Sequence, residues 1–282
     1  MPLKPQLSMA CEARAWAQFA NRNSLQMTQK RLLLVMAHPD DAEFSAGGLM
    51  TLWHQAGHRI KILCLTNGNA GHHTLSRSEL ADKRLDEARQ AAALVGADLE
   101  IWPVDDGRLT PSIELREKLI GAIRDFAPNL IVTHRTADYH PDHRATGQLV
   151  QDSAYLLQVP AIAPEHVVLS QMPSILLTYD RFRDPRPFRF DWVIDTGGVQ
   201  DNVIKLLACH ASQVFDWLPS LLPETNGPYD TAWLKQFYQR KPVKVADTYR
   251  TLNQTGSAIE FAEAFEVSDY GGRFTPDHYA FV

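Results

Sequence analysis

Residues 31–48 of the chain read RLLLVMAHPDDAEFSAGG, a short apolar run followed at once by polar side chains. The apolar part, residues 31–37, has the length of a β-strand and is rich in aliphatic side chains. It shows no alternation of polar and apolar residues, which is typical of a strand covered on both faces, as in a parallel sheet. The stretch therefore predicts a buried strand that carries His38, Asp40 and Asp41 at its carboxyl end.

Two similar apolar runs lie at residues 60–66 and 129–134. Residues 99–104 are a weaker strand candidate, because Pro103 has no N–H to donate to a ladder. These runs predict further strands of the same sheet.

Helical patterns separate the runs. The capping box SRSE at residues 76–79 predicts a long helix that ends near Gly96. Thr110 followed by Pro111 predicts the start of a second helix, which ends near Phe126. Strands and helices therefore alternate along this part of the chain.

The alternation continues to about residue 158 and predicts an α/β fold with a Rossmann-like, doubly wound and mostly parallel sheet. Later patterns are less regular, with strands expected at residues 174–179 and 192–195, a helix at 200–211, and loops and short helices at 219–242. We expect an N-terminal extension at residues 1–30 and a single domain at residues 31–282. Within this domain, residues 31–158 are expected to form the Rossmann-like core, and residues 159–282 to complete the sheet and form the pocket.

Charge and composition disfavour several classes of partner. The formal net charge is −5, whereas nucleic acid and anionic membranes bind clustered Lys and Arg. No run approaches the ~20 apolar residues that membrane insertion needs, and the N-terminus lacks the continuous apolar segment of a signal peptide. The three cysteines are scattered, which is typical of reduced thiols in a cytoplasmic protein.

A second polar cluster, His140-Pro141-Asp142-His143, follows the run at residues 129–134. Ligands of open α/β sheets bind at the carboxyl ends of strands, so the two clusters are expected to meet there. Imidazole and carboxylate groups suit Zn²⁺, and three protein ligands with an open position are typical of catalytic zinc. The same groups also bind iron, manganese or cobalt. The clusters therefore predict one shared metal site.

Both clusters, together with Gly47 and Gly48, closely resemble the LmbE/PIG-L-like family of zinc-dependent deacetylases. The resemblance extends over residues 31–213 through supporting positions, namely Thr66, Asn67, Gly68, Arg84, Glu87, Asp106, Gly107, Lys205, His210, Ala211, Ser212 and Gln213. That family removes the N-acetyl group from N-acetylglucosaminyl conjugates on a Rossmann-like fold. The resemblance implies a zinc-dependent hydrolase acting on a small amidated sugar.

The resemblance also implies roles for the residues of the first cluster. His38, Asp41 and His143 correspond to the family's metal ligands. Asp40 corresponds to the general base, which would take a proton from the attacking water.

The resemblance extends to the groups around the reacting bond. His140 corresponds to the histidine that assists the oxyanion or the leaving group, and Asp142 to the acid that orients it. A protonated His140 would stabilise the oxyanion. Arg84 and Asp106 are expected to contact the sugar.

Other functions remain open at this point. One is a metal-dependent amidase that releases a larger acyl group, and another is a non-catalytic protein that binds a metal or a carbohydrate. Binding alone has no use for a base such as Asp40 beside the ligands. A nucleotide site is disfavoured, because the GxGxxG fingerprint is absent after the first strand. Assembly as a homo-oligomer is also open.

Overall fold

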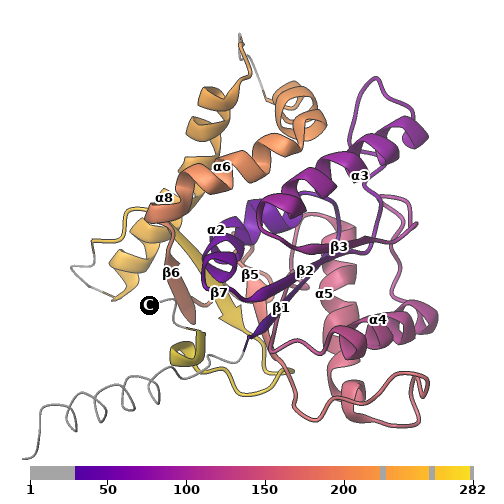
Figure 1. Cartoon of the computed structure of the whole chain (residues 1–282). Coiled ribbons are helices and arrows are strands. Elements are labelled where there is room, and N and C mark those ends of the chain that lie inside the picture. Colours follow the sequence, from indigo (N-terminus) through magenta and orange to yellow (C-terminus); the bar gives the residue numbers. More distant parts are fainter. Residues whose placement is uncertain (1–28, 223–226, 254–257, 280–282) are drawn as a thin grey trace, which may run out of the picture.

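The computed structural model describes residues 29–222, 227–253 and 258–279, so the predicted extension at residues 1–30 lies almost wholly outside it. Seven strands form one sheet in the order β3-β2-β1-β4-β5-β7-β6 (Figure 1). Their bounds are β1 Arg31–Met36, β2 Arg59–Cys64, β3 Asp98–Ile101, β4 Leu130–Thr133, β5 Ser174–Thr178, β6 Trp192–Asp195 and β7 Ala262–Val267.

The sheet is mostly parallel. Strand β1 pairs in parallel with β2 and with β4, so that Leu34 lies opposite Ile62 on one side and Val132 on the other. Strands β3 and β5 extend this parallel arrangement, and β7 runs antiparallel to its neighbours β5 and β6. The predicted α/β class, with a doubly wound and mostly parallel sheet, is confirmed.

Helices cover both faces of the sheet (Figure 1). The alternating side chains of β1 show the two layers, since Leu34 packs with residues of α2 and Leu33 with residues of α4 and α5. Helix α6 packs on α2 and on α3, and α8 packs on α6 and β7. The bounds are α2 Asp41–Gln55, α3 Arg77–Leu94, α4 Ile113–Phe126, α5 Pro141–Ala154, α6 Gln200–Cys209, α7 Leu218–Ser220 and α8 Thr231–Asn253, with shorter turns at Tyr155–Gln158, Gly197–Val199, Ser212–Trp217 and Pro276–Tyr279.

Most predicted boundaries in the first half agree with the structure. The capping box is present, with Ser76 and Glu79 each bonding the other's backbone N–H. Helix α4 begins at Ile113 rather than at Pro111, because the Ser112 side chain accepts the N–H of Leu115 and caps the helix there. Strand β3 lies at the sheet edge and ends before Pro103, as a residue without an N–H requires.

The prediction for the C-terminal third was wrong in two places. Residues 219–242 were expected to form loops and short helices, but α8 begins at Thr231 and continues through Pro242. Strand β7 was not expected at all. It carries Glu263 and Glu266, both buried, and therefore lacks the continuous apolar run that marked the other strands.

Helix α2 is kinked, and the kink ties it to the end of the chain. Ala46 has non-helical dihedral angles. Just beyond it, the N–H groups of Gly48 and Leu49 donate to the Glu263 carboxylate of β7, at 2.7 and 2.9 Å. A Cβ at Gly48 would lie 2.4 Å from a methyl carbon of Thr196, so this close approach requires glycine. Strand β7 thus fixes the helix that follows the first polar cluster.

Candidate metal centre and active site

The site lies between β1 and β4, where the order of the strands reverses. The chain leaves β1 and enters α2 through the segment HPDD, and the chain after β4 enters α5 through HPDH. The Asp41 carboxylate accepts the His38 backbone N–H at 2.7 Å, which closes the first loop. Asp40 has φ 118°, a conformation that costs a non-glycine residue energy and that is concentrated at functional sites.

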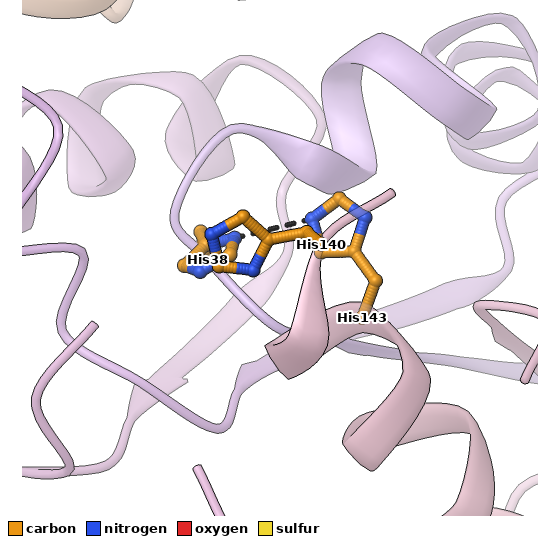
Figure 2. A group of neighbouring side chains, drawn as sticks. All are labelled: His38, His140 and His143. Carbon is orange, nitrogen blue, oxygen red and sulfur yellow. Dashed lines mark hydrogen bonds between the residues drawn. The ribbon is translucent and has the colours of Figure 1, made fainter. Parts of the chain in front are cut away.

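Three side chains converge at this point. His38 Nδ1 lies 3.3 Å from Asp41 Oδ2 and 3.2 Å from His143 Nε2, and His143 Nε2 lies 3.3 Å from Asp41 Oδ1. Ligands at ~2.1 Å from a tetrahedral metal are separated by about these distances. Figure 2 shows the rings of His38, His140 and His143 gathered together, with the dashed contact between His38 and His143. The structure therefore brings together the three residues expected to be ligands.

Neighbouring side chains create further possible donor sets around the same point. His140 lies near His38 and His143, and His134 lies near Asp41 and His143. The His134 ring stacks on His143 with centroids 4.0 Å apart, and its Nε2 accepts the Ala37 N–H. That hydrogen bond occupies the lone pair of His134 Nε2, which makes this residue a weaker donor than the other two histidines.

The opposite nitrogen of each converging histidine faces a carboxylate. His38 Nε2 lies 3.3 Å from Asp142 Oδ2 and 3.3 Å from Asp106 Oδ1, and His143 Nδ1 lies 3.0 Å from Asp138 Oδ1. In a neutral ring whose proton is on the nitrogen that faces Asp106, Asp142 or Asp138, the converging nitrogen would have a lone pair for an ion. Metal-binding histidines are typically oriented in this way.

Asp138 was missed in the sequence analysis. It precedes the HPDH segment by only two residues, and its carboxylate also accepts the His140 N–H. A carboxylate at this position was a usable signal, since metal-bound histidines commonly have such a partner.

The charge of the site suits a cation. Burial lowers the pKa of His38, but hydrogen bonds to Asp106, Asp142 and Asp41 outweigh it and raise that pKa well above its usual value. The carboxylates thus hold an excess of negative charge in a buried place. The donor types, their spacing and this charge all fit a divalent metal ion held by histidine and aspartate.

Asp142 has a different partner from the one expected. It was expected to orient His140, but its carboxylate contacts His38 and accepts the N–H groups of Gly107 and Leu109. Asp142 is fully buried, so these bonds hold it in one orientation. The physical reason is its place in the first turn of α5, from which the side chain points toward the end of β1 rather than along its own loop.

His140 lies at the edge of the cluster and faces the pocket. Its ring is 4.5 Å from that of His38, and its Nδ1 accepts the Asp142 backbone N–H at 3.2 Å. Nε2 therefore carries the hydrogen. Burial, followed by the neighbouring His38 and His143, lowers the pKa of His140. These surroundings favour the neutral ring with an Nε2–H donor, and the protonated form stays a prediction. The acid nearest to Nε2 is Asp106, at 3.8 Å.

Asp40 and Arg84 form a buried ion pair. Arg84 Nη2 lies 2.9 Å from Asp40 Oδ1, and the same guanidinium donates to the carbonyls of Pro39 and Gly68. Burial raises the pKa of Asp40 to about 6, although Arg84 opposes this shift. Arg84 is only 2% exposed, so it holds Asp40 in place in addition to lining the pocket.

Two residues matched by the supporting motifs lie behind the site. His210 is fully buried, and its Nε2 is 3.4 Å from Glu43 of α2. Glu87 of α3 accepts both the N–H and the hydroxyl of Ser212. These contacts join α2 and α3 to the segment after α6.

The cluster forms the floor of a cavity of about 730 Å³. Above the floor, the wall includes residues of α8, of the segment before it and of the loop after β5, together with Ala70 and Gly71. Its apolar and cationic side chains include Phe182, Trp217, Phe237, Arg181, Lys241 and Lys244, and its polar ones include Asp180, Tyr179 and Gln213.

Residues 33–154 match the family model PIG-L: GlcNAc-PI de-N-acetylase. The chain is similar to the 4-oxalmesaconate hydratase of Pseudomonas putida, at 23% identity over 70% of this chain and 79% of that enzyme. It is also similar to the probable N-acetyl-alpha-D-glucosaminyl L-malate deacetylase 2 of Bacillus anthracis, at 28% identity over 44% of this chain but only 59% of that protein. The predicted resemblance to LmbE/PIG-L-like proteins is confirmed.

The fold has solved counterparts. The N,N'-diacetylchitobiose deacetylase from Pyrococcus horikoshii superposes with a TM-score of 0.70 at 21% identity, over 95% of this chain and 96% of that chain. At this identity the likeness shows a shared fold. In the part of the chain that the structure describes, no helix has the length and apolarity to cross a membrane.

Proposed function

We propose that the protein is a metal-dependent hydrolase that removes an N-acetyl group from an N-acetylglucosamine-type conjugate. The match of residues 33–154 to the PIG-L family model supports this proposal. The observation that supports this most is the convergence of His38 Nδ1, Asp41 and His143 Nε2 within 3.3 Å of one another. Asp40 lies beside them with its own separate partner, Arg84. Zn²⁺ is the proposed ion, and other divalent transition metals fit the same donors.

When bound, the ion would act as a Lewis acid and lower the pKa of a water to ~7. The residues of the chain divide the remaining work. Arg84 holds Asp40 Oδ1, which leaves Oδ2 to accept the proton of the attacking water. Such general-base help accelerates a reaction by ~10²–10⁴-fold. The leaving nitrogen also needs a proton, and Asp40 can return to it the proton that was taken from the water.

His140 serves the oxyanion in this proposal. Its Nδ1 is occupied by the Asp142 N–H, so Nε2–H is the group offered to the pocket. A single well-placed donor to an oxyanion lowers the activation barrier by ~3–4 kcal/mol. Asp106 lies beside both His38 and His140, and with Arg84 it lines the space for the sugar.

A second candidate reaction is the addition of water to a carbon–carbon double bond. It is favoured by one observation, the likeness to a hydratase over 70% of this chain. Both reactions use an activated water and a base, so the floor of the site suits either. A metal-dependent amidase for a larger acyl group also fits a cavity of about 730 Å³. A binding protein without catalysis leaves the placement of Asp40 unexplained.

The test is an assay of purified protein that has been stripped of metal and reloaded with zinc, alongside its metal content. The panel contains N-acetylglucosaminyl conjugates, amides of longer acids, and an unsaturated dicarboxylic acid. We expect zinc-dependent release of acetate from the sugar conjugates. Zinc-dependent hydration of the unsaturated acid without acetate release would instead support the second candidate. Failure to bind metal under any loading condition would overturn both.

A further inference from the structure

The cationic part of the pocket wall is not used by the proposed mechanism. Helix α8 brings Lys241 and Lys244, three residues apart, to the same cavity as the histidine–aspartate floor, and Arg181 lies at its rim after β5. Residues three apart lie on one face of a helix, so both lysines can reach one group.

Lys241 is partly buried and makes one hydrogen bond within the part of the chain that the structure describes. Its ammonium donates to the carbonyl of Phe44 at 3.0 Å. That carbonyl lies four residues before Gly48, whose N–H donates to Glu263 beyond the kink of α2. An ammonium has three N–H donors, so two of those of Lys241 remain after this bond.

No carboxylate of the described ranges 29–222, 227–253 and 258–279 forms an ion pair within 4.0 Å of Lys241, Lys244 or Arg181. The carboxylates that face Lys241 are those of Glu263, Asp41, Asp138 and Asp180, and all lie beyond that distance. Lys244 and Arg181 are exposed, but Lys241 is partly buried. A partly buried lysine without an ion-pair partner is uncommon, because removing the charge from water is costly.

The surroundings of these carboxylates explain why they do not pair with Lys241. Glu263 is occupied by the two N–H groups of α2, and Asp180 by Arg135 at 2.8 Å. Asp41 and Asp138 face the histidines of the floor. The ammonium therefore has spare donors, a charge without a close counter-ion among the described residues, and an open side toward the cavity.

We propose that Lys241, assisted by Lys244 and Arg181, binds an anionic oxyacid group of the substrate, a carboxylate or a phosphate, carried by the part opposite the acetamide. This inference rests on the proposed function in that it takes the cavity to be the substrate pocket. It narrows the substrate class to N-acetylated conjugates with an acidic substituent.

The test compares substrates that differ only in charge: methyl N-acetylglucosaminide, N-acetylglucosamine 1-phosphate, and a glycoside of a hydroxy acid. For the wild-type, zinc-loaded protein we expect the KM of at least one acidic substrate to be ~10–100-fold below that of the methyl glycoside. A hydrogen bond to a charged group changes affinity by about this factor. Whichever acid has the lower KM identifies carboxylate or phosphate as the group that is bound.

The variants are Lys241→Met, Lys241→Arg and a control, Lys235→Met. Lys235 lies on the same helix but pairs with Asp201 away from the pocket, at 2.7 Å. Lys241→Met should lower kcat/KM on the acidic substrates by at least ~10-fold more than on the methyl glycoside, and Lys241→Arg should keep part of the preference for acid. Lys235→Met should retain it fully. An equal loss on acidic and neutral substrates would make Lys241 a structural residue and overturn the proposal.

Absence of a preference in the wild-type protein would also overturn it. If no conjugate is hydrolysed, the proposed function fails, and binding then decides the inference separately. Calorimetric titration of the 1-phosphate and of the methyl glycoside would be compared for the wild-type and Lys241→Met proteins. Tighter binding of the phosphate that is lost in Lys241→Met would still support the anion site, and equal binding would refute it.

Discussion

The floor of the pocket and its wall differ in how the chain builds them. The floor comes from two short segments that directly follow β1 and β4, adjacent strands of the sheet. The wall includes α8 and the loop after β5, and α8 contacts the floor segment through side chains such as Lys241, which bonds the carbonyl of Phe44. The floor can therefore be placed by backbone topology, whereas the α8 part of the wall depends on particular side chains.

This difference suggests a division between chemistry and specificity. The floor holds the acidic and imidazole groups that can activate water, while the wall holds the apolar and cationic groups that contact the rest of a substrate. Changes to the floor should thus affect all substrates alike. Changes to the wall should alter the choice among substrates, unless they disturb the contacts that hold the floor.

The largest expected effect belongs to Asp40. Asp40→Asn should lower kcat by ~10²–10⁴-fold on every substrate, because the amide cannot accept the proton of water. Metal content, measured by atomic emission, should stay at the wild-type level. Loss of metal in this variant would show that Asp40 is a ligand, and the floor would then need a different base.

Asp40→Gly separates the side chain's contact with Arg84 from the cost of the backbone conformation. Glycine adopts φ 118° without that cost, but it also removes the acceptor of the buried Arg84 guanidinium, so this variant should unfold at a lower temperature than Asp40→Asn, which keeps an amide oxygen there. Both variants should be equally inactive. A large difference in their activity would contradict the role of the side chain.

The next effect concerns Asp138, which lies behind His143. Asp138→Asn should weaken metal binding by ~10–100-fold, because the ring of His143 loses the charged partner of its Nδ1–H. A competition titration with a chelator measures this change. With saturating zinc most of the activity should return; unchanged affinity would mean that the partner of His143 does not matter.

A third experiment tests whether the helix that follows the first polar cluster, α2, needs its close packing against Thr196 and against Glu263 of β7. Gly48→Ala places a methyl group 2.4 Å from Thr196 and 3.0 Å from the Glu263 carboxylate. Overpacking of this kind costs ~1–3 kcal/mol of unfolding free energy. Gly198→Ala is the control, since nothing in the described part of the chain lies within 4 Å of a Cβ there. Urea unfolding of both variants measures the difference, and equal stabilities would contradict the close packing described.

The last effect is a dependence of stability on pH, which is confined to one pH window. Burial raises the pKa of Glu263 from 4.5 to about 7 despite the N–H groups of Gly48 and Leu49. Between these values the folded protein binds more protons at this position than the unfolded chain, so stability falls as the pH rises through the window. Glu263→Gln lacks this contribution. Across the window, the wild-type protein should lose ~3 kcal/mol relative to the variant, since one pKa unit corresponds to ~1.4 kcal/mol. A difference in unfolding free energy between the two proteins that is the same at every pH, measured by urea unfolding, would refute this.

The sequence predicted the first four strands and the place of the site because parallel, doubly covered strands are marked by uninterrupted apolar runs. Residues 31–37 are such a run, and the carboxyl end of β1 lies where the pattern indicated. The convergence of His38, Asp41 and His143 followed from the loops after β1 and β4.

The remaining features could not be read from local patterns. Helix α8 was missed because Pro242 normally ends a helix, but here the helix continues through it. Strand β7 was missed because buried Glu263 and Glu266 receive partners from distant segments. The contact of Asp142 with His38 spans 104 residues and depends on side-chain direction.

The bond between Glu263 and Gly48 has a consequence for the synthesis of the protein. It joins residues 215 positions apart, so the HPDD segment and helix α2 are synthesised long before the carboxylate that anchors this helix. Contacts of such long range form late in folding. A growing chain should therefore gain the mature site only near the end of translation. Shortening the protein before β7 should leave a species that still has the ligands, yet is readily cut by proteases near residue 46.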